Sequence, residues 1–154
     1  MKRALWLVVG ICLLAAIFAG CSGKPTNISY DVDTLSQKIR EGGSFSDLLS
    51  PVDKKMAGSL YGFDSEKVTE CALLCSTGAT TEEVGIFKCT DEEYAKELLS
   101  LAQARVKTQK STYESYAPGE IPKLDDSLVY GEGQYVFYVV SLDSAKAKEI
   151  IKGQ

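Results

Sequence analysis

The sequence contains no histidine in its 154 residues. Histidine is the most frequent general base of enzymes and the most frequent metal-ligating side chain, so a serine–histidine catalytic arrangement is excluded. A glycine-rich phosphate-binding loop is also missing, because Gly131 and Gly133 belong to a predicted hairpin turn and the other glycines are dispersed. These absences remove the most easily recognised classes of enzyme, and we expect neither catalytic residues nor a cofactor.

Basic residues are scarce beyond the first few positions. Lys2 and Arg3 are two of the 17 basic residues, and all 21 acidic residues lie after residue 20, so residues 21–154 carry a net charge of −6. No run of basic residues occurs there, which argues against nucleic acid as a partner and against attraction to anionic lipid as an anchoring force. The length that remains suits a single domain with one core.

The first twenty residues have the layout of an export signal. Lys2 and Arg3 precede an uncharged apolar stretch, residues 4–19, and two small residues, Ala19 and Gly20, end it. This is the arrangement of a signal peptide. The apolar stretch is shorter than the ~20 residues that a membrane-spanning helix needs.

The residues around the predicted cleavage position resemble the lipobox of bacterial lipoproteins: Phe18-Ala19-Gly20-Cys21. In that class the cysteine thiol receives a diacylglycerol, the peptide is cut before the cysteine, and the new amino terminus is often acylated, for example with palmitate. The class prefers leucine where Phe18 stands. Two or three acyl chains give stable anchoring, whereas one gives marginal binding.

We therefore expect a lipoprotein signal peptide over residues 1–20, a lipidated tether over 21–30 and a single domain over 31–154. The domain is expected on the extracytoplasmic face of the cell membrane, held by lipid on Cys21. The alternative is an ordinary signal peptide, or an uncleaved anchor, in which Cys21 occurs by chance.

The domain itself alternates strand and helix patterns. Two short helices are expected first, one opened by Asp31 and one with Ser50 as its N-cap, Pro51 at its first position and Met56 and Leu60 on its buried side. Four strands and two further helices follow. Their expected positions are strands at 68–76, 83–89, 128–130 and 134–141, a helix from a Thr90–Glu93 capping box to before Pro118, a loop at 117–127, and a helix capped by Asp143.

These elements form two strand-strand-helix units. A shift of 52 residues places Asp91 on Asp143 and superposes two similar helix sequences, which reflects either duplication or convergent helix patterning. The predicted fold is α+β, with an antiparallel four-stranded sheet and helices packed on one face. Residues 135–140 are apolar on both alternating faces, so that strand is expected to be covered on both sides.

Several short runs resemble a known family over roughly residues 32–152. They are Leu60-Tyr61-Gly62-Phe63-Asp64, residues 76–84, Ile86-Phe87-Lys88, Tyr116-Ala117-Pro118, Ile121-Pro122-Lys123-Leu124 and Tyr135-Val136-Phe137. This pattern is similar to that of small Gram-positive, Clostridia-type lipoproteins grouped as domain of unknown function 4358. The resemblance implies a surface lipoprotein domain. The family supplies no activity, so no catalytic residue is carried over.

Three cysteines remain in the domain: Cys71, Cys75 and Cys89. If the turn between the first two long strands is symmetric about Thr80, Cys71 lies opposite Cys89, which would allow a cross-strand disulfide. Three alternatives stay open at this point, namely buried free thiols, one disulfide with a thiol left over, and a thiol or metal role. A zinc site would need a fourth ligand, and none is evident.

Other polar residues give weaker signals. Asp125-Asp126 lies in the predicted loop and suits a divalent cation, Glu82-Glu83 precedes a strand, and Asp91-Glu92-Glu93 is explained by helix capping and the helix dipole. Six tyrosines near element ends and in the last hairpin fit either a binding surface or the margins of a small sheet. They are Tyr61, Tyr113, Tyr116, Tyr130, Tyr135 and Tyr138.

The expected function is that of a membrane-anchored extracytoplasmic lipoprotein. Its domain is expected to be a non-catalytic module that binds an envelope protein or a small ligand, with no nucleic acid involved. The alternative is an envelope thiol/disulfide or metal-binding protein that works through Cys71, Cys75 and Cys89. A third hypothesis, a hydrolase working through carboxylates, needs an acid pair in a cleft.

Overall fold

The computed structural model describes residues 29–154, so the predicted signal peptide and the lipidation site Cys21 lie outside the described residues. The described chain forms one sheet of five strands in the order β1-β2-β3-β5-β4, and every neighbouring pair is antiparallel. The strands are β1 (Ser50–Val52), β2 (Val68–Cys75), β3 (Glu83–Cys89), β4 (Leu128–Glu132) and β5 (Tyr135–Val140).

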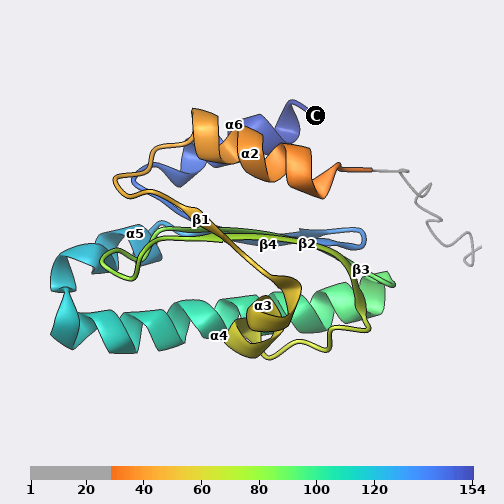
Figure 1. Ribbon diagram of the computed structural model, residues 1–154, viewed down its shortest axis with the longest axis horizontal. Coiled ribbons are helices and arrows are strands. Elements are labelled where there is room, and N and C mark those ends of the chain that lie inside the picture. Colours follow the sequence, from red (N-terminus) through yellow and green to blue (C-terminus); the bar gives the residue numbers. More distant parts are fainter. Residues whose placement is uncertain (1–28) are drawn as a thin grey trace, which may run out of the picture.

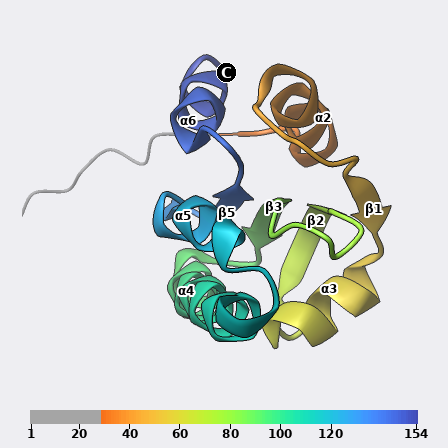
Figure 2. The ribbon, with the colours of Figure 1, turned by 90° about the vertical axis from the view of Figure 1, so that its left-hand side faces the viewer.

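Helices cover both faces of this sheet (Figures 1 and 2). The helices α2 and α6 pack on one face, which we call the α2 face, and α3, α4 and α5 pack on the other, which we call the α4 face. The helices are α2 (Val32–Gly42), α3 (Lys54–Tyr61), α4 (Glu92–Tyr116), the short 3-10 helix η1 (Pro118–Glu120), α5 (Ile121–Asp125) and α6 (Ser144–Lys152).

The predicted α+β class is confirmed, but the expectations of four strands and of helices on one face are wrong. Helices are needed on both faces because the central strands are apolar on both: all six residues of β5 are buried, and on β3 Ile86 packs on the α2 face while Phe87 packs on the α4 face. The two strand-strand-helix units exist as β2-β3-α4 and β4-β5-α6, yet α4 and α6 lie on opposite faces.

The fifth strand is the segment that was expected to start a helix. Ser50 pairs with Cys75, Pro51 with Leu74 and Val52 with Leu73, so residues 50–52 form an edge strand. A proline at a sheet edge is tolerated because its missing amide need not face the neighbouring strand.

The helix α3 therefore begins later than expected, at Lys54. Its N-cap is Asp53, whose carboxylate accepts a hydrogen bond from the Met56 amide at 2.9 Å. The helix ends at Gly62, whose φ of 78° lies in the left-handed region that favours glycine. Its expected buried side is wrong, because Met56 and Leu60 are 52% and 40% exposed while Ala57 and Tyr61 are buried.

Two other local expectations need correction. The N-cap of α4 is Asp91, which accepts from the Tyr94 amide at 2.8 Å, and not Thr90. The predicted loop at 117–127 contains η1 and α5, and Leu124 of α5 is buried on the α4 face. The expectation that a helix opens at Asp31 is confirmed: Asp31 is the N-cap of α2, and its carboxylate accepts from the Thr34 amide at 2.8 Å.

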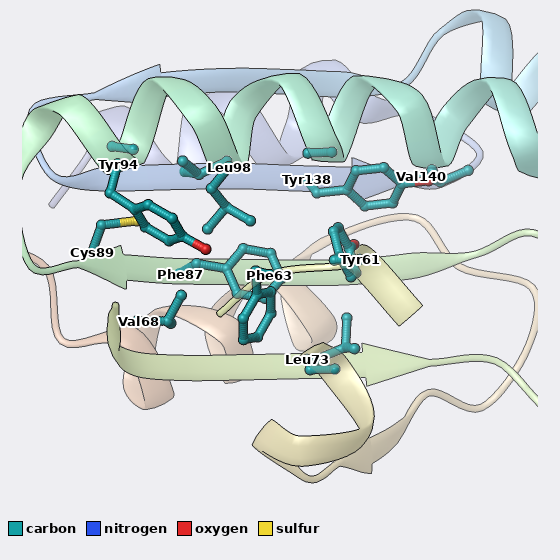
Figure 3. Packing of buried hydrophobic residues seen from close by; sticks show 14 of the residues in the cluster. Tyr61, Phe63, Val68, Leu73, Phe87, Cys89, Tyr94, Leu98, Tyr138 and Val140 are labelled. Carbon is teal, nitrogen blue, oxygen red and sulfur yellow. The ribbon is translucent and has the colours of Figure 1, made fainter. Parts of the chain in front are cut away.

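Each face has its own apolar core. On the α4 face, aromatic rings from three elements meet, with Tyr61 of α3 and Phe63 both packing against Phe87 of β3 and Tyr138 of β5 lying beside Tyr61 (Figure 3). On the α2 face, Ile39, Ile86 and Phe137 are fully buried. Within residues 29–154 no helix is both long enough and apolar enough to cross a membrane.

Candidate functional site

Four connecting segments meet at one end of the sheet, where α4 also ends (Figure 1). We call this the loop end; its segments are residues 43–49, 76–82, 117–127 and 141–143. Tyr30, close to where the described chain begins, lies at the opposite end, and its hydroxyl donates to Glu132 beside the β4–β5 turn at 2.8 Å. The loop end carries most of the buried charge of the described chain.

Glu83 is the first residue of β3, and its side chain is buried on the α4 face, being 2% exposed. Its carboxylate accepts two hydrogen bonds from Arg105 of α4, from Nε at 2.8 Å and from Nη2 at 2.6 Å. The Tyr61 hydroxyl donates a third bond at 2.5 Å. A bidentate arginine pair satisfies a buried carboxylate well, because both oxygens receive N–H donors.

The cluster around Glu83 extends along α4. The Gln109 side chain donates to Glu83 at 3.2 Å and accepts from the Tyr138 hydroxyl at 2.5 Å, while the Arg105 guanidinium lies 4.8 Å from the centre of the Tyr61 ring. Burial, and then the charge of Glu83, raises the pKa of Tyr61 well above its usual value. Burial alone would lower the pKa of Arg105, but the hydrogen bonds and charge of Glu83 raise it. These groups hold their protons at neutral pH.

A small cavity of about 100 Å³ opens beside this cluster. It lies between the β2–β3 turn and α4, and its lining includes Cys75, Glu83, Arg105, Gln109 and Tyr113. A volume of that size holds a few water molecules and is far below the ~300 Å³ of a typical small-molecule pocket. The polar groups of Glu83, Arg105 and Gln109 are already bonded to one another, which favours a structural role for them.

The neighbouring Glu82 is equally buried, at 1% exposed, and it binds a different segment. Its carboxylate accepts from the Ser46 amide at 2.9 Å, the Ser46 hydroxyl at 2.7 Å, the Asp47 amide at 2.9 Å and the Lys123 ammonium at 3.0 Å. Burial alone would raise the pKa of Glu82, but the bonds from Ser46, Asp47 and Lys123 lower it. A single carboxylate thereby ties the α2–β1 segment to the β2–β3 turn.

Further bonds join the remaining segments. The Lys123 ammonium of α5 also binds Glu120 at 2.9 Å, and Glu120 accepts from the Thr81 amide at 2.9 Å. Asp47 accepts from the Thr77 hydroxyl at 2.9 Å, and the Leu142 amide donates to the Ser44 carbonyl at 2.8 Å. The loop end is therefore cross-linked by hydrogen bonds between all four segments, which restrains its backbone.

Large apolar side chains project from this restrained backbone. Leu48 is 74% exposed, Tyr116 is 69% exposed and Leu142 is 54% exposed. These three side chains come from different segments at the same end of the sheet, and exposed apolar side chains there can supply contact area to a partner.

The cysteines do not lie as the symmetric turn predicted. Cys71 pairs with Phe87, and Cys89 pairs with Val68 because the register shifts between Val68 and Glu70, so the expected Cys71–Cys89 pairing across the strands is wrong. All three cysteines are free thiols in the described chain. Burial raises the pKa of Cys71 and Cys89 to about 11 and that of Cys75 to about 12.

The predicted carboxylate positions are separated from one another. Asp125 binds Lys110 at 2.6 Å, and Asp91 caps α4. Among residues 29–154 no three cysteine, aspartate or glutamate side chains are grouped so as to hold a metal ion. Asp125-Asp126 and Glu82 lie in different segments of the loop end, and Glu83 is the first residue of β3.

Sequence reasoning missed the partners of these two glutamates. Arg105 and Gln109 lie 22 and 26 positions from Glu83, and Lys123 lies 41 positions from Glu82. The sequence does contain one indication of them: two acidic residues stand at the start of a strand that is apolar on both faces. An acidic side chain buried at such a position needs a cationic partner.

Comparison with known proteins gives one family. The model of the family described as Domain of unknown function (DUF4358) matches residues 42–141, and the chain belongs to that family. No curated protein matches the chain. No solved structure matches it either.

Proposed function

We propose that this chain is a lipid-anchored extracytoplasmic module that is not a catalyst and binds another envelope protein through its loop end. The observation that carries the proposal is the exposure of Leu48 and Leu142 on segments joined by hydrogen bonds, together with the exposure of Tyr116 at the adjoining end of α4. A pre-ordered backbone favours binding because less conformational entropy is lost on association. The apolar side chains supply the contact area.

The anchor in this proposal is lipid on Cys21, and the tether is residues 21–30. Tyr30 fixes the end of the tether against Glu132 and Tyr135, at the end of the sheet away from the loop end. The binding surface is thus separated from the point at which the tether joins the domain. A tether of about nine extended residues reaches at most ~30 Å, so the domain stays close to the lipid surface.

The thiol alternative receives little support from the cysteine environments. Thiolate is the reactive form, and burial raises the pKa of each of Cys71, Cys75 and Cys89 to about 11 or 12. We expect all three thiols of the folded domain to react with iodoacetamide far more slowly than in the chain unfolded in urea. One rapidly alkylated thiol would revive the alternative.

The binding surface is tested by photo-crosslinking in intact cells. A photoreactive amino acid at position 48, 116 or 142 should yield the same cross-linked partner, identified by mass spectrometry, whereas the same group at Met56 should not. Met56 is a matched control because it is apolar, 52% exposed and on α3. The purified partner should bind the wild-type chain and lose at least tenfold in affinity for Leu48→Asp. Cross-links that differ among the three positions would refute the proposal.

The anchor is tested separately by cell fractionation. The chain should be recovered in the membrane fraction with the mass of a diacylated or triacylated Cys21, and Cys21→Ser should abolish that mass and release the chain. A wild-type chain without lipid would refute the anchor, whatever the outcome of the cross-linking.

A further inference from the structure

The two edge strands of the sheet differ in how well they are protected from pairing with another strand. The edge strand β1 has three residues, and one of them is Pro51. The opposite edge strand, β4, has five residues, Leu128–Glu132, with no proline and a single charge at its last position. Short length, proline and charge are the usual devices that block edge-to-edge pairing. The edge of β4 has almost none of them.

The backbone of β4 offers hydrogen-bonding groups to a neighbour. The Cys89 amide donates to the Gln134 carbonyl at 2.8 Å. Because main-chain groups alternate in direction along a strand, the amides and carbonyls of the even-numbered residues of β5 point toward β3, and those of the odd-numbered residues point toward β4. The β4 residues paired with those odd positions are 128, 130 and 132, and the amides and carbonyls of Val129 and Gly131 therefore point away from the sheet. No hydrogen bond from the rest of residues 29–154 reaches these two residues.

Half-buried apolar side chains flank the same edge on both faces. On the α4 face they include Leu99 of α4 and Val129, and on the α2 face they include Leu128, Tyr130 and Ile150 of α6. An added strand would cover side chains on both sides of the sheet.

We propose that the edge of β4 pairs with the same edge of a second copy of this chain, giving a continuous ten-stranded sheet. The pairing is antiparallel about a two-fold axis at Tyr130. The two outward-facing residues suit this axis, because Val129 of one copy then lies opposite Gly131 of the other and exchanges two main-chain hydrogen bonds with it. The two-fold axis produces the same exchange between Gly131 of the first copy and Val129 of the second, so four main-chain hydrogen bonds form.

In this register the side chains of one copy fit those of the other. A Cβ placed on Gly131 would lie at ordinary contact distance, 3.6 Å, from Leu99 and from the Tyr135 carbonyl. Beside it, Leu99 and Gly131 line a cavity of about 150 Å³, into which the side chain of Val129 from the second copy extends, as a large residue opposite an edge glycine does. On the other face the two Tyr130 rings, each stacked on Phe137 at 4.8 Å, become direct cross-strand neighbours.

The symmetry also agrees with a membrane anchor, and this step rests on the proposed function. A two-fold axis perpendicular to the sheet places the α2 faces of both copies on the same side. Tyr30 packs on that face, beside Glu132 of β4, so both tethers leave from one side of the dimer and close to its axis. The two loop ends point in opposite directions and remain free to bind. An interface this small is weak in solution, and confinement to a membrane raises its effective concentration.

The test uses the full chain, purified in detergent and studied by sedimentation equilibrium at detergent density matching. We expect a concentration-dependent dimer. Of the hydrogen-bonding groups, Val129→Pro removes only an outward-facing amide, and it keeps an apolar side chain on the α4 face. It should therefore weaken the dimer at least tenfold without lowering the thermal unfolding midpoint at low concentration by more than a few degrees. Val129→Thr is the matched control, because it keeps the amide and a β-branched side chain of similar shape, and it should dimerise as the wild type does.

Residue-resolved hydrogen exchange then tests the register. The Val129 and Gly131 amides should exchange at least tenfold more slowly at high than at low protein concentration. A wild-type monomer at concentrations up to about 100 μM, an unchanged dimer in Val129→Pro, or concentration-independent exchange at both amides would overturn the proposal. The Cys21→Ser variant separates this pairing from the anchor, because it carries no lipid and should still dimerise at high concentration. If the wild-type chain proves to carry no lipid and yet dimerises, the proposed function is refuted and the pairing is not.

Discussion

The α4 face and the α2 face share the same strands but are closed by different interactions. The α4 face encloses the Glu83–Arg105 ion pair, with side chains 2% and 14% exposed, inside a cluster of tyrosines. The α2 face is closed by aliphatic and aromatic packing around Ile39, Ile86 and Phe137. A buried ion pair contributes little net stability but is costly to break, whereas apolar packing contributes in proportion to the area buried. The two faces should therefore respond differently to mutation.

The largest effect is expected for Arg105→Met. This change leaves the Glu83 carboxylate buried without its cation, and breaking a buried pair in this way costs about 3–5 kcal/mol. The free energy of unfolding from urea denaturation is the measurement. The double variant Glu83→Gln/Arg105→Met removes both charges and should be less destabilised than the single variant by at least about 1 kcal/mol. Additive losses would mean that the pair does not behave as a unit.

On the α2 face, Ile39→Ala should cost about 3 kcal/mol, because it removes buried methyl groups and leaves a cavity. Ile39 is fully buried, and its neighbours in the α2-face cluster are apolar. The loss should be the same at pH 5 and pH 8, since no ionisable group is uncovered. A loss that depended on pH would show that the two faces are coupled through the sheet.

Much of this contrast could not be predicted from the sequence. The alternation of apolar residues predicted β2, β3 and β5 and the double coverage of β5, because that pattern is local. The strand β1 was missed because it has three residues and contains Pro51, so its place depends entirely on pairing with β2. Only the acidic half of the charged cluster could be predicted, because Glu82-Glu83 precedes an apolar strand. Arg105 and Lys123 come from distant helices. In the sequence, a buried cation on a helix cannot be distinguished from an exposed one.

Acid should weaken the loop end through Glu82. The pKa of Glu82 is lowered from its usual 4.5 by the bonds from Ser46, Asp47 and Lys123. A carboxylate whose pKa is lower in the folded than in the unfolded chain stabilises the fold above the unfolded value, and that stability is lost as the pH falls through the folded value. The free energy of unfolding should therefore drop below about pH 4.5.

The matched variants for this prediction are Glu82→Gln and Glu114→Gln. Glu114 is exposed on α4, and its side chain takes part in no ion pair within residues 29–154. The acid-dependent drop should become shallower in Glu82→Gln and stay unchanged in Glu114→Gln. Equal curves for the wild type and Glu82→Gln would assign the acid sensitivity to other carboxylates, such as Glu120, whose pKa is also lowered.

The smallest effects come from two tyrosine hydroxyls that make the same kind of bond on the two faces. Tyr61 donates to Glu83 at 2.5 Å in a buried setting, and Tyr30 donates to Glu132 at 2.8 Å in a partly buried one. Tyr61→Phe deprives a buried carboxylate of a donor and should cost about 2 kcal/mol, whereas Tyr30→Phe should cost about 1 kcal/mol or less, because water can replace the lost donor. Both changes keep the ring, so urea denaturation measures the hydroxyl alone. Equal losses would show that the Glu83 cluster is as open to water as the tether end, in which case the difference between the two faces would lie in their composition and not in their burial.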